Sequence, residues 1–302
     1  ISSVTLGTSN FVAGVNAGNS IVSGGNYNTL VGDEAGTAIT TGTRNTATGY
    51  GSLEDCTTGE HNSAFGLASL ASNTTADNNT AVGYAALNAN TTADSNTAVG
   101  YSSLAANTTG TRNTAVGKSV LVANTTGVDN TAVGGIDASA AATLGSNTTG
   151  TNNVAVGGGA LHSNTTASNN TAIGYRSLKV NTTGHSNVAL GVEALDANTT
   201  ATYNTGLGFR TLSDNTTGAS NVAVGAGALK TNTTASNNTA VGYDALFANT
   251  TGDGNVAVGV QALGANTTSA GNTALGYGAA RTTTTGASNT AVGYLSLKQN
   301  TT

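Results

Sequence analysis

The stretch Asn79-Thr-Ala-Val-Gly-Tyr-Ala-Ala-Leu-Asn-Ala-Asn-Thr-Thr-Ala-Asp-Ser95 is followed at Asn96 by the same phrase again. Its leading asparagine recurs at Asn45, Asn62, Asn79, Asn96, Asn113, Asn130, Asn153, Asn170, Asn187, Asn204, Asn221, Asn238, Asn255, Asn272 and Asn289. Neighbouring starts are 17 residues apart, except that Asn130 and Asn153 are 23 apart. A fixed period of this length predicts a solenoid, in which each repeat is one coil stacked on the coil before it.

The sequence predicts an all-β parallel β-solenoid of 17-residue coils. Two looser coils begin at Asn10 and Asn28, which gives 17 coils in all. We expect residues 1–44 to hold a lead-in and these divergent coils, with Ile1, Val4 and Leu6 alternating as in a strand. Residues 45–302 should form the regular solenoid, with the inserted residues making a surface loop around 135–143.

Composition limits the kinds of function that fit. The chain has 302 residues with a net charge of −5, only 8% charged residues, and no proline, methionine or tryptophan. No basic run is present to neutralise phosphates, so we expect no nucleic-acid partner. No apolar run is long enough to predict a membrane span. The chain starts at Ile1 and stops within a repeat, so we expect it to be a segment of a longer protein.

Each coil can be numbered from its asparagine as position 1. Positions 2 to 4 read Thr or Val, Ala, then Val, Ile or Leu, and position 5 is Gly. Alternation predicts a strand with positions 2 and 4 on one face and position 3 on the other. Leucine at position 9, as at Leu87 and Leu104, predicts a second inward contact and a second short strand.

Glycine at position 5 and asparagine at positions 1 and 12 are expected where the coil turns, because both residues tolerate positive φ. Stacked coils would also bring identical side chains to about 4.8 Å spacing. Asparagine and threonine can form hydrogen-bonded ladders at that spacing, whereas like charges would repel. This accounts for the scarcity of charged residues.

The strand phrase resembles a known family. Asn153-Val-Ala-Val-Gly157, Asn170-Thr-Ala-Ile-Gly174 and Asn187-Val-Ala-Leu-Gly191 are similar to the repeats of YadA-like heads of trimeric autotransporter adhesins, and to repeats of some bacteriophage tail fibres. The resemblance implies a left-handed β-roll, with three chains side by side in an adhesive fibre. It also implies inward side chains at positions 2 and 4.

Candidate chemistry is sparse. The three histidines, His61, His162 and His185, stand at different repeat positions, so we expect no metal site. Asp33-Glu34 and Glu54-Asp55 are the only adjacent acidic pairs, and we interpret them as solvated turn residues rather than a glycosidase pair. We predict no catalytic residues and no cofactor. Cys56 replaces the asparagine of position 12, and contact between three copies of it around a threefold axis is the alternative to a simple substitution.

Asn-Thr-Thr is formally an N-glycosylation acceptor. It occurs at Asn73, Asn90, Asn107, Asn124, Asn147, Asn164, Asn181, Asn198, Asn215, Asn232, Asn249, Asn266 and Asn300. A ladder of asparagines followed by strand threonines explains the repetition without any glycan, and we favour it. Tyrosine recurs at position 6, and a strip for packing or for surface binding would include Tyr84, Tyr101, Tyr175, Tyr243, Tyr277 and Tyr294. We expect Tyr84 to stack on Tyr101, and Tyr277 on Tyr294.

Three functions remain open. The first is a structural and adhesive fibre segment without catalysis, located outside the cell, on the cell surface or on a virion. Its partners would be further copies of the chain, as a homotrimer, and a host-surface glycan or protein. The second is a filament subunit that polymerises end to end, and the third is an ice-binding solenoid that uses the Thr columns of positions 13 and 14.

Overall fold

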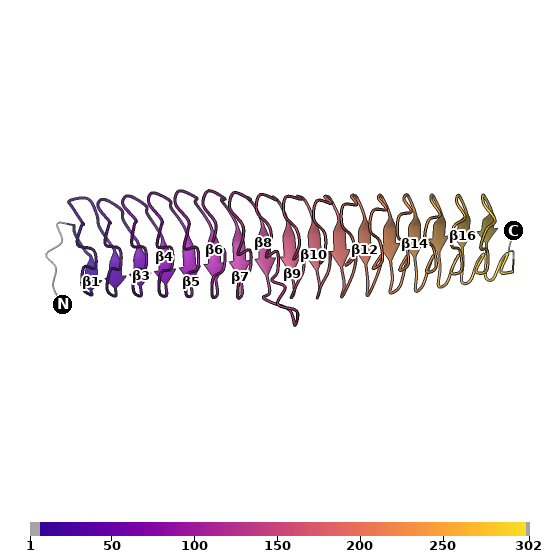
Figure 1. Cartoon of the computed structure of the whole chain (residues 1–302), viewed down its shortest axis with the longest axis horizontal. Coiled ribbons are helices and arrows are strands. Elements are labelled where there is room, and N and C mark those ends of the chain that lie inside the picture. Colours follow the sequence, from indigo (N-terminus) through magenta and orange to yellow (C-terminus); the bar gives the residue numbers. More distant parts are fainter. Residues whose placement is uncertain (1–6, 300–302) are drawn as a thin grey trace. The chain divides into compact units, whose positions relative to one another are not determined.

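A computed structural model describes residues 7–299, so the expected strand at Ile1, Val4 and Leu6 lies outside the described residues. The described part consists of parallel β-solenoid coils, each with one three-residue strand, and contains no helix (Figure 1). The first unit ends at Asn153. Its strands are β1 (Phe11–Ala13), β2 (Thr29–Val31), β3 (Thr46–Thr48), β4 (Ser63–Phe65), β5 (Thr80–Val82), β6 (Thr97–Val99), β7 (Thr114–Val116) and β8 (Thr131–Val133).

The second unit begins at Val154 and has the same construction. Its strands are β9 (Val154–Val156), β10 (Thr171–Ile173), β11 (Val188–Leu190), β12 (Thr205–Leu207), β13 (Val222–Val224), β14 (Thr239–Val241), β15 (Val256–Val258), β16 (Thr273–Leu275) and β17 (Thr290–Val292). Within each unit neighbouring strands pair in parallel, position by position, as Thr80 with Thr97 and Ala81 with Ala98. The predicted parallel solenoid of seventeen coils is confirmed.

The predicted orientation of the strand is wrong. Alanine at position 3 points inward and is fully buried, as at Ala81 and Ala98, whereas positions 2 and 4 face outward. The reason is the narrow interior. At Gly206, which occupies position 3, an added Cβ would lie 3.4 Å from the Cδ1 atom of Leu195 at position 9. Because the leucine fills the space opposite the strand, only a small side chain fits at position 3 of such coils. In the coil of β2, where position 9 is Gly36, the buried Leu30 occupies position 3 instead.

The second strand is also absent from the described coils. Leucine at position 9 is buried as predicted, but it lies in a turn with positive φ, which is 54° at Leu87. Its backbone N–H still bonds to the next coil, at 3.0 Å from Leu87 N to Ser103 O. A leucine in this conformation is strained, and burial of its side chain offsets that cost.

Asparagine does not supply the positive φ that we expected at positions 1 and 12. The left-handed residues are instead at positions 7, 9 and 17, such as Ala85, Leu87 and Ser95, together with glycine at position 5. Asparagine side chains instead form hydrogen bonds between neighbouring coils.

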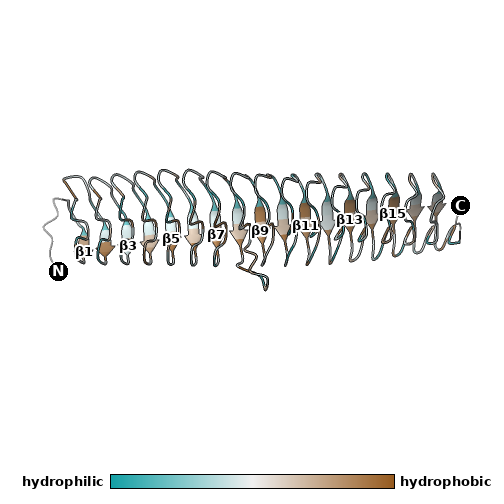
Figure 2. Cartoon of the chain, in the orientation of Figure 1, coloured by the Kyte–Doolittle hydropathy of each residue, from teal (hydrophilic) through white to brown (hydrophobic). Residues whose placement is uncertain are grey.

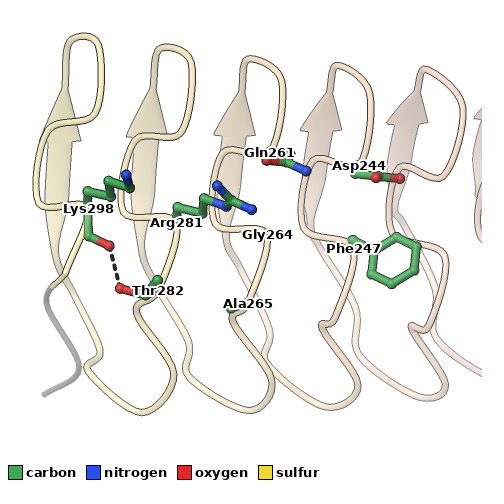
Figure 3. Close-up of a pocket in the computed structure, with 8 residues that line it drawn as sticks. All are labelled: Asp244, Phe247, Gln261, Gly264, Ala265, Arg281, Thr282 and Lys298. Carbon is green, nitrogen blue, oxygen red and sulfur yellow. Dashed lines mark hydrogen bonds between the residues drawn. The ribbon is translucent and has the colours of Figure 1, made fainter.

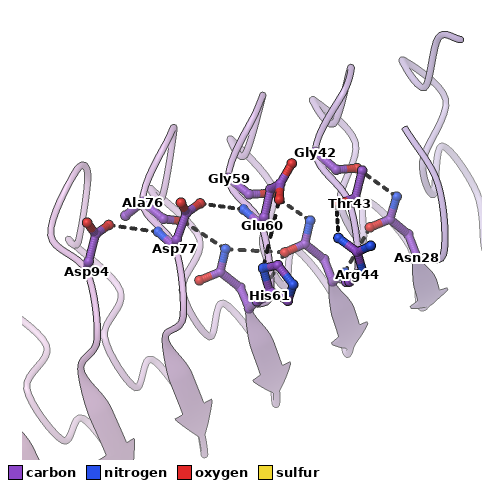
Figure 4. Close-up of polar contacts among 12 residues, drawn as sticks. Asn28, Gly42, Thr43, Arg44, Gly59, Glu60, His61, Ala76, Asp77 and Asp94 are labelled. Carbon is purple, nitrogen blue, oxygen red and sulfur yellow. Dashed lines mark hydrogen bonds and ion pairs between the residues drawn. The ribbon is translucent and has the colours of Figure 1, made fainter. Parts of the chain in front are cut away.

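The predicted asparagine ladders are confirmed in two columns. At position 12, Asn90 Nδ2 donates to Asn73 Oδ1 at 3.2 Å and to the Ala93 carbonyl at 3.0 Å. At position 1, the side chain links three segments, because Asn96 Nδ2 donates to the Gly110 carbonyl while Asn96 N donates to Asn79 Oδ1. Figure 4 shows the same link from Asn28 to Gly42. These side chains satisfy buried polar groups that the narrow apolar core cannot cover.

The inserted residues form a loop that leaves the stack after β8 (Figure 1). Ile136 and Ala142 make an antiparallel bridge, and Asp137 Oδ1 accepts hydrogen bonds from Ser139 N at 2.8 Å and from Ala141 N at 2.9 Å. Leu144 then returns to the buried position 9. The insertion therefore leaves the core column intact. In residues 7–299 no helix has the length and hydropathy to cross a membrane.

Candidate functional site

The histidines and acidic pairs singled out from the sequence do not converge. His185 packs edge-on against Tyr203, and His61 lies 3.9 Å from Glu60 as a surface pair. No group of three His, Cys, Asp or Glu side chains arranged for a metal ion occurs in the described range 7–299.

The pair Asp33-Glu34 has a structural task. Asp33 Oδ1 accepts a hydrogen bond from Val15 N at 3.1 Å, and Glu34 Oε1 accepts one from Asn16 Nδ2 at 2.8 Å. Both carboxylates therefore tie one coil to the coil before it. Glu54 and Asp55 are exposed surface residues.

One short column of like charges is present. Acidic side chains do stack in a column at position 16, where Glu60, Asp77 and Asp94 lie on successive coils (Figure 4). Asp77 Oδ1 accepts from Glu60 N at 2.7 Å, and Asp94 Oδ1 accepts from Asp77 N at 2.8 Å. Because each aspartate is held by a backbone N–H of the preceding coil, the hydrogen bond offsets the repulsion between exposed like charges.

The Asn-Thr-Thr asparagines are buried from Asn73 to Asn266, and their amide nitrogens lie in the position 12 ladder. A glycan requires an amide nitrogen at the surface, and these nitrogens face the interior. Asn300 lies outside the described residues.

Cys56 is equally inaccessible. Its thiol lies in the same column, 3.8 Å from Asn73 Nδ2, and burial raises its pKa to about 11. Because the side chain is enclosed, three copies of it cannot meet around an axis.

The predicted tyrosine pairs are present. The rings of Tyr84 and Tyr101 stack with centroids 5.1 Å apart, and those of Tyr277 and Tyr294 with centroids 5.4 Å apart. Tyr175 and Tyr243 are single exposed rings. All six side chains therefore lie at the surface rather than in the core.

The two threonine columns differ. At position 13 the hydroxyl donates to the next coil, as from Thr108 Oγ1 to the Thr125 carbonyl at 3.1 Å. Position 14 is exposed, as at Thr92, Thr109 and Thr126. Only the position 14 column therefore faces fully outward.

The sequence analysis missed a charged face on the second unit. All of the lysines and arginines between 154 and 302 stand at position 7 or 10 of their coils. They are Arg176, Lys179, Arg210, Lys230, Arg281 and Lys298. We call the side chains at positions 6, 7, 10 and 11 of residues 192–298 the charged face. Sorting charged residues by repeat position would have found it in the sequence.

The first part of the charged face is acidic. Glu193, Asp196 and Asp214 line a shallow hollow of about 260 Å³ together with Arg210 and Lys230. Arg210 Nε donates to Glu193 Oε2 at 2.6 Å, and its guanidinium lies 5.2 Å from the ring centre of Phe209. Burial, with the nearby charge of Glu193, raises the pKa of Asp196 to about 6. Asp196 is thus the carboxyl group here that titrates near neutral pH.

The second part of the charged face is basic and contains a groove of about 290 Å³ (Figure 3). Phe247, Gly264, Arg281 and Lys298 follow one another at position 10 of successive coils. The side chains of Phe247, Arg281 and Lys298 lean toward the preceding coil, and Gly264 leaves the floor between Arg281 and Phe247 open. Gln261 and Asp244 form the opposite wall.

Comparison with known proteins gives no family assignment. No protein-family model matches the chain, and no curated protein matches it.

Proposed function

We propose that the chain is a segment of an extracellular structural and adhesive fibre, without catalysis, in which three copies lie side by side. The repeated phrase resembles adhesin heads and phage tail fibres, and the observation that carries the proposal is an apolar stripe on the outside of the strands.

The apolar stripe consists of the outward side chains at positions 2 and 4. Its exposed members are Phe11, Phe65, Val82, Val133, Val188, Leu190, Val222, Val256, Leu275 and Val292. Leu190 is 46% exposed and Leu275 is 48% exposed. Figure 2 shows β9, β11, β13 and β15 as hydrophobic strands. A sheet face that meets only water is normally polar, so this stripe favours contact with another apolar surface.

A second copy of the chain is the partner that fits the stripe. Position 4 is apolar in both units except at Thr48, so an identical chain offers a matching apolar column in each unit, whereas position 2 is valine only at 154, 188, 222 and 256. The interior favours a stiff structural element because the same hydrogen bonds recur from coil to coil. Variation is left to the outer positions, where a fibre would contact its target.

Light scattering at several concentrations tests the proposal. We expect a concentration-independent mass of three times the 29.2 kDa chain. The double variant Leu190→Asp with Leu275→Asp should lower the mass to that of one chain, because it places charges in the stripe without touching the core. The matched control, Tyr84→Ser with Tyr277→Ser, should keep the trimer. A single-chain mass for the unmodified protein would refute side-by-side assembly, and a mass that rises with concentration would indicate the end-to-end filament.

Ice binding is the second candidate, and the exposed threonine column at position 14 favours it. This column presents hydroxyl and methyl groups at one regular spacing along each unit. Ice binding is tested by measuring thermal hysteresis on the unmodified chain and on the double variant Thr92→Lys with Thr109→Lys. Hysteresis that the double variant abolishes would support ice binding, and no hysteresis in the unmodified chain would reject it.

A further inference from the structure

We infer that the groove between Phe247 and Lys298 binds a carboxylated oligosaccharide, which lies along the coils. The inference rests on the proposed adhesive function and names the chemistry of its target. The site is made by one glycine in a column of large side chains.

The hollow itself comes from Gly264. Position 10 of the neighbouring coils carries Lys230, Phe247, Arg281 and Lys298. Each of these side chains covers its own coil, whereas Gly264 leaves the same place on its coil open. The spacing of adjacent coils is about 4.8 Å, close to the length of one sugar ring in a glycan chain. A ring placed over Gly264 would therefore lie beside the Arg281 side chain, and the next ring along the coils would reach Phe247, which leans toward the preceding coil.

Charge in the groove selects an anion. Among the described residues, neither Arg281 nor Lys298 has a carboxylate within ion-pair distance. Lys230 lies with its Nζ atom 5.3 Å from the ring centre of Phe247, also without an ion pair. Asp244 is the one acid lining the groove. The planar guanidinium of Arg281 matches a carboxylate with two parallel hydrogen bonds.

The remaining lining suits a sugar. Phe247 offers an apolar surface for the C–H groups of a ring, and the Gln261 side chain offers an amide for its hydroxyls. Only three cations are spread over the five coils from Lys230 to Lys298. This spacing of cations matches a polymer with no more than one carboxylate per ring. A densely sulfated chain would require more cations per coil.

An acidic peptide fits less well. Extended peptides gain much of their affinity from main-chain hydrogen bonds to an open edge. In the groove the backbone is already engaged, since Ala248 N donates to the Gly264 carbonyl at 3.1 Å and Ala265 N donates to the Arg281 carbonyl at 2.9 Å. Recognition must therefore use side chains, as it does for glycans.

Calorimetric titration of the intact chain tests the inference. The probe is a galacturonic acid hexasaccharide, with a neutral galactose hexasaccharide, a sulfated hexasaccharide and a polyglutamate peptide as comparisons. We expect binding of the carboxylated sugar and a loss of about tenfold or more in affinity for Arg281→Ala, because a charge-assisted bidentate contact is removed. Phe247→Ala should weaken binding as well, and Gly264→Leu should abolish it by filling the hollow.

The matched controls are Arg112→Ala and Tyr50→Ala, which change an exposed arginine and an exposed aromatic residue in the first unit. They should leave the affinity unchanged. The inference is overturned if the carboxylated sugar does not bind, if the neutral sugar, sulfated sugar or peptide binds as tightly, or if Gly264→Leu binds normally. The mass of each sample separates the two proposals. A trimer that does not bind the carboxylated sugar refutes only sugar binding in the groove. A single chain that binds the sugar refutes only the side-by-side fibre.

Discussion

Buried asparagine is the residue on which the coils depend. In the position 12 column, Asn107 Nδ2 donates to Asn90 Oδ1 at 2.9 Å, and Asn124 Nδ2 donates to Asn107 Oδ1 at 2.9 Å. Each side chain also closes its own turn by bonding to the carbonyl three residues ahead. Cys56 and Thr283 replace asparagine at position 12 of their coils, and the buried Thr283 hydroxyl has no hydrogen-bond partner. Threonine at this position therefore does not reproduce the hydrogen bonds of asparagine.

Asn90→Ala should lower the free energy of unfolding by about 3 kcal/mol, because several buried groups lose their partners at once. Those groups include Asn73 Oδ1, the Ala93 carbonyl and Asn107 Nδ2. Urea unfolding followed by circular dichroism measures the change. Thr92→Ala in the same turn is the control, and it should cost less than about 0.5 kcal/mol because Thr92 is exposed. Equal effects from both variants would contradict the ladder's role.

Asp196 should make stability depend on pH in a direction opposite to that of an ion-paired carboxylate. Its pKa rises from an ordinary 3.8 to about 6 in the folded chain, chiefly through burial. The folded state therefore holds the proton more tightly, and the stabilisation from this group is fully present below pH 3.8 and lost as pH rises through about 6.

Asp196→Asn isolates this effect because asparagine does not titrate. The unfolding free energy of the variant minus that of the unmodified chain should grow as pH rises from below 3.8 to above 6. Thermal unfolding at a series of pH values measures the difference. Asp94→Asn, whose carboxylate lies exposed in the position 16 column, is the control. A difference that stays flat or shrinks with pH for Asp196→Asn would contradict the assignment.

At the scale of the element, one coil is a three-residue strand followed by a series of tight turns. Glycine at position 5 ends the strand, where φ is +130° at Gly83 and an added Cβ would lie 2.6 Å from the Gly100 carbonyl oxygen. The same close approach recurs at Gly66 and Gly100, each against the glycine of the next coil. No side chain fits between backbones stacked this closely.

Gly83→Ala should therefore destabilise the chain by about 3 kcal/mol or more, since it adds a backbone clash to an unfavourable φ. Gly135→Ala is a matched control because an added Cβ there meets no heavy atom within 4 Å. Urea unfolding midpoints compare the two. A Gly83→Ala chain as stable as Gly135→Ala would show that the coils tolerate a wider spacing than the structure has.

The period of the coils, the parallel register and the buried leucine column could be predicted from the sequence, because each depends on residues that repeat every coil. The facing of the strand could not, because Thr-Ala-Val alternates equally well either way. The structure shows that a leucine at position 9 leaves room for only a small side chain at position 3, whereas Gly36 at position 9 leaves room for Leu30. The left-handed Leu87 was missed for a related reason, since leucine rarely adopts positive φ unless tertiary packing imposes it.

The candidate sites show the same limit. Stacking of Tyr84 on Tyr101 followed from the period alone. The groove did not, because it depends on how Arg281, Gly264 and Phe247 align across three coils rather than on any motif within one.

At the scale of the whole molecule, each coil bonds only to its neighbours in the stack, and stability in such a protein is close to a sum of coil and interface contributions. One hydrogen-bonded interior, repeated from coil to coil, supports outer columns that are free to vary. The strand amides of both units should therefore be equally protected from hydrogen exchange, whatever side chains their coils display.

Amide hydrogen exchange followed by mass spectrometry tests this claim most directly. In every coil from β2 to β16 the position 2 amide should be protected, because its N–H donates to the carbonyl of the next asparagine at 2.8–2.9 Å in each. This should hold even for coils whose outer side chains differ as much as those of Tyr84 and Gly264. Protection restricted to a few coils, with the remaining strands exchanging as fast as free chain, would contradict the account.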